Sequence, residues 1–129
     1  MLNINTIISD FNTILGGKVM SLSEEWVNTE LSNSEFEILH RAPDVEYSFY
    51  NSVKAGDMDA VIENCKQDAF INLEGTGILS QNPLTNIKYH FVVTTAMITR
   101  YCIDGGLEAE QAYRLSDFYI LKMDSCNTI

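Results

Sequence analysis

The chain has 129 residues, 46% of them hydrophobic and 20% charged, which is the balance of a folded domain with one core rather than of a disordered segment. Its formal net charge is −10, and a surface this acidic repels phosphate backbones, so we do not expect these residues to bind nucleic acid by themselves. No signal peptide is apparent and no apolar run is long enough to cross a bilayer, which favours a cytoplasmic protein.

The first third of the chain predicts short helices joined by connectors. Apolar residues recur at helical spacing over residues 5–15, and the two glycines that follow are expected to end that helix. Residues 18–22 alternate weakly and fit either a short strand or a connector. Ser23 precedes two glutamates, which predicts a cap and a short helix through Leu31, and residues 32–35 supply a further cap.

The middle of the chain predicts a helical hairpin followed by a loop. Pro43 suits the first position of a helix whose apolar stripe reaches Val53. Gly56-Asp57 breaks that helix, and the aspartate can cap a second helix that extends to Cys65. Residues 72–82 contain glycine and serine with few large side chains, so we expect a loop there.

The last third predicts a long helix and a second helix folded back on it. Asn82-Pro83 marks the start of the long helix, which runs to about Asp104 and is apolar around most of its circumference. Such a helix is expected to be buried in the centre of its domain or in an oligomer interface. Gly105-Gly106 then predicts a left-handed cap. The returning helix has an apolar side formed by Ala112, Leu115, Phe118, Tyr119, Leu121 and Met123.

These patterns predict an all-α or nearly all-α fold, because the evidence for strands is confined to one short, weakly alternating segment. We expect a single compact helical domain over residues 1–129. Its centre would be the long apolar helix. This helix forms a carboxyl-terminal helical hairpin with the helix that follows it.

The residues with chemical potential do not form a recognised catalytic or metal-binding pattern. His40 lies beside Arg41, which opposes a bound cation, and His90 is expected to be a packed or hydrogen-bonded imidazole within the long helix. No phosphate-binding glycine loop or nucleophile motif is present. The three cysteines have no CxxC spacing, which indicates reduced thiols. We therefore expect neither an enzyme nor a metal or cofactor.

Two sets of residues are candidates for a structural or binding role. Arg100 interrupts the apolar surface of the long helix, and a buried pair with Asp117 would fix the register of the two helices more than it would stabilise them. The alternative is that Arg100 contacts an anion or a ligand. The candidates for a pocket or interface are Phe49, Tyr50, Tyr89, His90 and Tyr119. For the aromatic residues, the alternative is ordinary core packing.

Several segments together resemble the amino-terminal region of AraC/XylS-type transcriptional regulators of Firmicute bacteria. The matching segments are 82–89, 99–100, 103–107 and 112–120, with an upstream piece over 43–57. The run from Gly106 to Ile120 is long and unusual. The resemblance covers about residues 34–126, whereas residues 1–33 carry no recognised motif and are expected to be a variable part.

The resemblance implies a cytoplasmic regulatory domain that forms a homodimer, senses an unknown small-molecule effector, or does both. In such regulators this helical region precedes a pair of DNA-binding helix-turn-helix units. No basic recognition helix occurs within the 129 residues, so nucleic acid is expected to be bound only through that further domain. The alternative is a helical protein–protein interaction module that senses no ligand.

Overall fold

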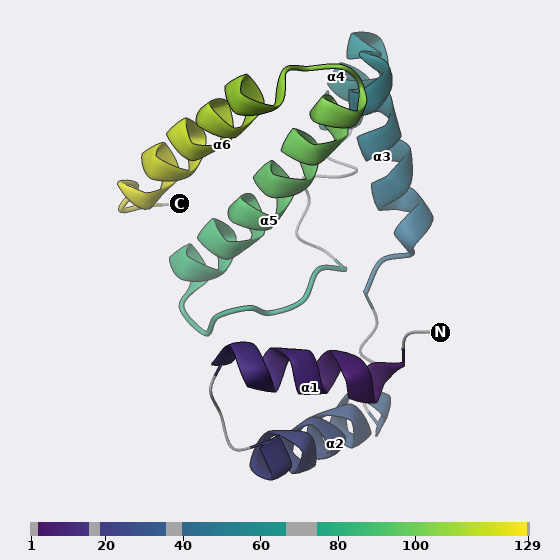
Figure 1. Cartoon of the computed structure of the whole chain (residues 1–129), viewed down its shortest axis with the longest axis vertical. Coiled ribbons are helices and arrows are strands. Elements are labelled where there is room, and N and C mark those ends of the chain that lie inside the picture. Colours follow the sequence, from purple (N-terminus) through teal and green to yellow (C-terminus); the bar gives the residue numbers. More distant parts are fainter. Residues whose placement is uncertain (1–2, 16–18, 36–39, 67–74, 129) are drawn as a thin grey trace. The chain divides into compact units, whose positions relative to one another are not determined.

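Six α-helices and no strand are found in the residues that the computed structural model describes, which are 3–15, 19–35, 40–66 and 75–128. The chain forms two compact units, Met1–Leu39 and His40–Ile129, and each is described by itself (Figure 1). The all-α fold class predicted from the sequence is confirmed.

The first unit consists of α1 (Ile4–Leu15) and α2 (Val19–Glu35), which pack against each other. Asn3 caps α1, because its Oδ1 accepts a hydrogen bond from the Thr6 amide at 3.0 Å. Helix α1 carries a stripe of apolar side chains that remain exposed, Ile4, Ile7, Phe11, Ile14 and Leu15. None of the side chains described in this unit is buried.

Helix α2 differs from the sequence prediction. It begins at Val19 and runs without interruption to Glu35, so both alternatives for residues 19–22, a short strand and a connector, are wrong, and so are the caps predicted at Ser23 and at 32–35. The alternation is too short to outweigh the good helix formers in and after it, including Leu22 and the two glutamates that follow Ser23. The predicted helix end at 16–17 lies outside the described residues.

The second unit opens with the predicted hairpin of α3 (Pro43–Ala55) and α4 (Met58–Lys66), and Pro43 takes the first helical position. Gly56 ends α3 with a left-handed φ of 70°, while its amide donates to Val53 O and the next amide donates to Ser52 O. These two bonds form a Schellman motif. Asp57 then caps α4, because its Oδ1 accepts from the Ala60 amide at 3.0 Å. These predictions are confirmed.

Helix α5 (Pro83–Asp104) and helix α6 (Ala109–Asp124) form the second hairpin. The predicted cap at Asn82 is confirmed, since its Oδ1 accepts from the Thr85 amide at 3.0 Å. Residues 75–82, the described part of the predicted loop, contain neither helix nor strand. At the start of α6 the Glu108 carboxylate accepts from the amides of Glu110 and Gln111.

The two glycines between α5 and α6 have different roles, whereas the sequence assigned both to one left-handed cap. Only Gly106 has a positive φ, 111°, and its amide donates to Ile103 O. Gly105 keeps a right-handed φ of −80°. It is constrained by space instead, because a Cβ at this position would overlap the Lys54 carbonyl oxygen near the end of α3.

The core of the second unit lies between α3 and α5. Phe49 and Tyr50 are buried there, with Tyr50 stacked on Tyr101 at 5.3 Å between ring centroids. Partly buried apolar residues complete the cluster: Val53, Val61, Met97, Ile98 and Tyr101. Helix α5 packs against α3 on one side and α6 on another (Figure 1).

Helix α5 lies centrally in the second unit, between α3 and α6, but most of its side chains are only partly buried. Thr99 is the one buried residue in the helix, and Tyr89 and Val93 remain 49% and 54% exposed. The reason is that α3 and α6 cover only part of the circumference of α5. The other alternative, an oligomer interface, stays a prediction.

Candidate functional site

Small residues lie at the contact between α5 and α6, in the half of the hairpin nearer the connection between the helices. On α6, Ala112 and Ser116 are 3% and 7% exposed and lie one turn apart. On α5, Thr99 is 7% exposed, and its Oγ1 donates to the Thr95 carbonyl at 2.7 Å. Because these side chains are short, the helix backbones can approach closely. The larger side chains around the contact leave a space between them.

A groove of about 280 Å³ lies along this contact. Its lining comes from α5, α6 and the connection between them, and consists of Phe91, Thr95, Ile98, Thr99, Cys102, Leu107, Ala112, Leu115, Ser116 and Tyr119. None of these ten side chains carries a formal charge. The groove is therefore a mostly apolar site with a few hydroxyl groups and one thiol.

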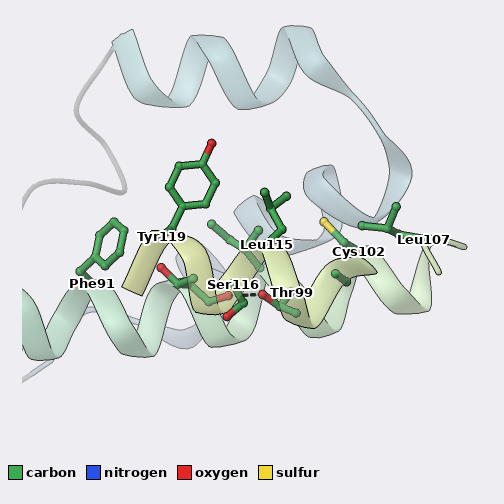
Figure 2. Close-up of a pocket in the computed structure, with 10 residues that line it drawn as sticks. Phe91, Thr99, Cys102, Leu107, Leu115, Ser116 and Tyr119 are labelled. Carbon is green, nitrogen blue, oxygen red and sulfur yellow. Dashed lines mark hydrogen bonds between the residues drawn. The ribbon is translucent and has the colours of Figure 1, made fainter. Parts of the chain in front are cut away.

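Figure 2 shows how the lining side chains are distributed. Phe91 and Tyr119 lie toward one end, Cys102 and Leu107 lie toward the other, and the buried hydroxyl residues lie between them (Figure 2). Leu115 and Tyr119 are 51% and 50% exposed, so this wall of the groove borders solvent. An apolar molecule that enters the groove would cover these side chains and remove their surface from water.

The two buried hydroxyl residues of the groove, Thr99 and Ser116, differ in their hydrogen bonding. The Thr99 hydroxyl is satisfied within its own helix by the Thr95 carbonyl. Ser116 is as deeply buried and lines the groove, yet no hydrogen bond of its side chain is found within the described part of the chain. The Ser116 Oγ is not among the fully buried atoms without a partner in the described residues, so this hydroxyl keeps some access to the groove and is the polar group best placed to bond to a ligand there.

The predicted buried pair of Arg100 and Asp117 is wrong. Both side chains are exposed, and no ion pair joins them in the residues described. The Arg100 guanidinium donates to Ala96 O at 3.3 Å and lies 5.3 Å from the centre of the Tyr113 ring. Arg100 and Asp117 each follow a buried residue of the α5–α6 contact, and successive helical positions differ by about 100°, so their side chains turn away from the contact.

The five candidate pocket or interface residues occupy separate places. Phe49 and Tyr50 belong to the core, and burial raises the pKa of the Tyr50 hydroxyl above its usual range, opposed by a hydrogen bond with Thr94. Tyr89 is exposed on α5. Tyr119 is the one candidate among the five that lines the groove.

The His90 side chain makes a hydrogen bond within the chain. Its Nε2 lies 2.7 Å from the Gly77 carbonyl oxygen. A Cβ at Gly77 would come within 2.7 Å of His40 Nε2, so both imidazoles pack against this glycine. No cluster of three or more metal-ligand side chains occurs in the part of the chain that the structure describes.

Sequence reasoning missed most of the groove. It gave weight to large apolar residues and to charges, whereas Thr95 and Thr99 face Ala112 and Ser116 across the contact. The signal was present as small residues four positions apart on each of two adjacent helices. Read together, these two spacings indicate a close helix–helix contact.

Comparisons with known proteins identify no relative: no family model, no curated protein and no solved structure matches the chain. Within the described residues, no helix has both the length and the apolar character needed to cross a membrane.

Proposed function

We propose that this chain is a cytoplasmic regulatory domain of a bacterial transcriptional regulator, acting through homodimerisation, effector binding or both. Its state would be passed to a DNA-binding part of the same regulator. Two findings support the proposal: the sequence resemblance to AraC/XylS-type regulators and the surface of the α5–α6 hairpin, which contains most of the resembling segments. The exposed apolar surface of the α5–α6 hairpin is the main observation behind the proposal.

The α5–α6 hairpin leaves large apolar side chains exposed on more than one face. Around the groove these are Leu115 and Tyr119, and on α5 they are Tyr89, Val92 and Val93. Contiguous exposed apolar side chains on a folded domain indicate a surface that binds something. The lining of the groove places no imidazole or carboxylate beside its hydroxyls and thiol, which favours binding over catalysis.

The exposed patch on α5 suits an interface with a second copy. Tyr89, Val92 and Val93 are spaced as neighbours on one helical face. Two copies of such a face can pack about a twofold axis, because each presents the same apolar surface to the other. We expect a homodimer with twice the 14.5 kDa mass of the chain.

Light scattering and sedimentation of the wild type and Val93→Glu test the dimer. A charge placed in the centre of an apolar interface should raise the dissociation constant by tenfold or more, on the order of a hot-spot loss. Gln81→Glu adds the same charge at an exposed position outside the helices and should leave the mass unchanged. A wild type that is monomeric at all concentrations would remove dimerisation from the proposal.

The regulatory assignment itself is tested by the reading frame beyond Ile129. We expect it to encode a basic segment with two helix-turn-helix units. A frame without such a segment would remove the transcriptional part of the proposal and leave the groove and the dimer interface.

An interaction module without ligand sensing is the second candidate, and helix α1 favours it. Ile4, Ile7, Phe11 and Ile14 recur at spacings of three and four residues and are all exposed. This is the spacing of a helix that packs lengthwise against a partner helix. If Phe11→Glu, rather than Val93→Glu, abolishes self-association, the interaction module is the better description of the chain.

A further inference from the structure

We propose that the α5–α6 groove binds an uncharged, largely apolar small molecule with one hydroxyl or carbonyl group, which forms a hydrogen bond with the Ser116 hydroxyl. This inference rests on the proposed regulatory function and names the chemical class of the effector. It concerns the groove alone and is independent of the α5 patch at which dimerisation is expected.

The size of the groove suits a compact molecule. An apolar cavity of about 150 Å³ holds a benzene ring, and this groove has about 280 Å³. There is therefore room for a fused two-ring compound or a short aliphatic chain. Leu107, Leu115 and Tyr119 border solvent at the groove and would be covered by the bound molecule.

The charge of the ligand follows from the lining and from the protein as a whole. None of the ten lining side chains carries a formal charge that could neutralise an ionic ligand. Placing an unpaired charge in an apolar site is strongly unfavourable. The net charge of −10 further opposes anions such as carboxylates and phosphates. A neutral molecule is the class that remains.

The polar group of the ligand follows from Ser116. This residue is 7% exposed and lines the groove, and no hydrogen bond of its side chain is found within the described residues. Thr99, equally buried, already donates to the Thr95 carbonyl. The Ser116 Oγ keeps some access to the groove, and a hydroxyl both donates and accepts, so a ligand hydroxyl or carbonyl can form a hydrogen bond with it.

Cys102 provides a reporter within the site. Its thiol lines the groove and is partly buried, whereas Cys65 and Cys126 are exposed. In the Cys65→Ser/Cys126→Ser protein, the rate at which 4,4′-dithiodipyridine modifies the remaining thiol measures access to the groove. A molecule bound there should slow the reaction in proportion to its occupancy.

The probes are 1-naphthol and naphthalene, which differ by one hydroxyl. Both should protect Cys102, and 1-naphthol should bind more tightly by a factor of up to about ten, the order of one net hydrogen bond. Ser116→Ala should remove this preference while naphthalene protects as before. Thr99→Val is the matched control and should keep the preference, because the Thr99 hydroxyl is committed to its own helix. Circular dichroism checks that both variants are folded.

Each other outcome overturns the inference. Failure of both probes to protect Cys102 shows that the groove takes no such molecule. An unchanged preference in Ser116→Ala shows that Ser116 does not hold the polar group. Protection that depends on protein concentration alone shows that a second copy covers the groove.

The proposed function is judged separately by the mass of the protein and by the reading frame beyond Ile129. A dimeric protein that binds neither probe overturns the ligand class and leaves regulation by dimerisation in place. If the groove binds 1-naphthol but the reading frame encodes no DNA-binding segment, the ligand class is supported and the transcriptional part of the proposed function is overturned.

Discussion

The two compact units of this chain use apolar side chains in different ways. The unit formed by α1 and α2 has regular apolar spacing along α1, yet its described side chains are all at least partly exposed. The unit formed by α3 to α6 buries residues from three helices, some of them small or polar, such as Thr99 and Ser116. A helical hydrophobic pattern therefore predicts a helix in both units, whereas burial depends on the number of helices that surround each position.

The largest expected effect comes from emptying the core of the second unit. Phe49→Ala removes a ring that is 6% exposed and in edge contact with Tyr50, and it should cost about 3–5 kcal/mol of stability. Phe11→Ala in α1 is the matched change at a position that is 59% exposed, and it should cost about 0.5 kcal/mol or less. Urea unfolding at low protein concentration measures both. Equal losses would contradict the difference in burial between the units.

The next effect concerns the two glycines after α5. Gly105→Ala should cost about 1–3 kcal/mol, because its Cβ would overlap the Lys54 carbonyl and force α3 and α5 apart. Gly106→Ala meets nothing within 4 Å but must hold a φ of 111°, which should cost about 1–2 kcal/mol. Thermal unfolding gives the two values. Additional replacement of Lys54 with glycine should not rescue Gly105→Ala, since the obstacle is backbone.

Local signals in the sequence predicted the helices because the signals act within a few residues. Pro43 marks a helix start by its preset backbone angle at the first helical position, whereas Asn82 and Asp57 do so as side-chain caps. None of these signals needs a distant partner, and all three predictions are confirmed. Apart from the strand and caps predicted within α2, the failures concern contacts between helices. The Arg100–Asp117 pair was inferred without knowing which faces of α5 and α6 meet.

The groove could be predicted only in outline, for the same reason. Tyr119 was a candidate because it is large and aromatic, whereas Thr95, Thr99 and Ala112 have side chains too small to draw attention singly. These residues form the groove only because small side chains on α5 lie opposite small side chains on α6. A single helical pattern does not specify which positions on a neighbouring helix it will meet.

A smaller effect compares the same cap in both units. Asn3 and Asn82 each accept a hydrogen bond from the amide three residues on, at 3.0 Å. Asn82→Ala should lower the stability of the second unit by about 1 kcal/mol, because α5 packs against both α3 and α6. Asn3→Ala should instead speed hydrogen exchange in the first turn of α1, with little change in the main unfolding transition. A shared loss in that transition would show that α1 unfolds with the second unit.

The smallest expected effect is confined to alkaline pH and to the buried Tyr50. Burial raises the pKa of its hydroxyl in the folded state, so the unfolded chain releases this proton first as the pH rises above about 10. The folded state then binds more protons than the unfolded state, and stability falls with rising pH, whereas below that range Tyr50 adds no pH dependence. Tyr50→Phe should have a lower free energy of unfolding at pH 7, because it lacks the hydrogen bond with Thr94. Above pH 10 its free energy of unfolding should fall less steeply than that of the wild type, because it has no phenol to ionise. Unfolding free energies at intervals from neutral to alkaline pH provide both slopes. Equal slopes in the two proteins would mean that the alkaline loss of stability does not come from ionisation of Tyr50.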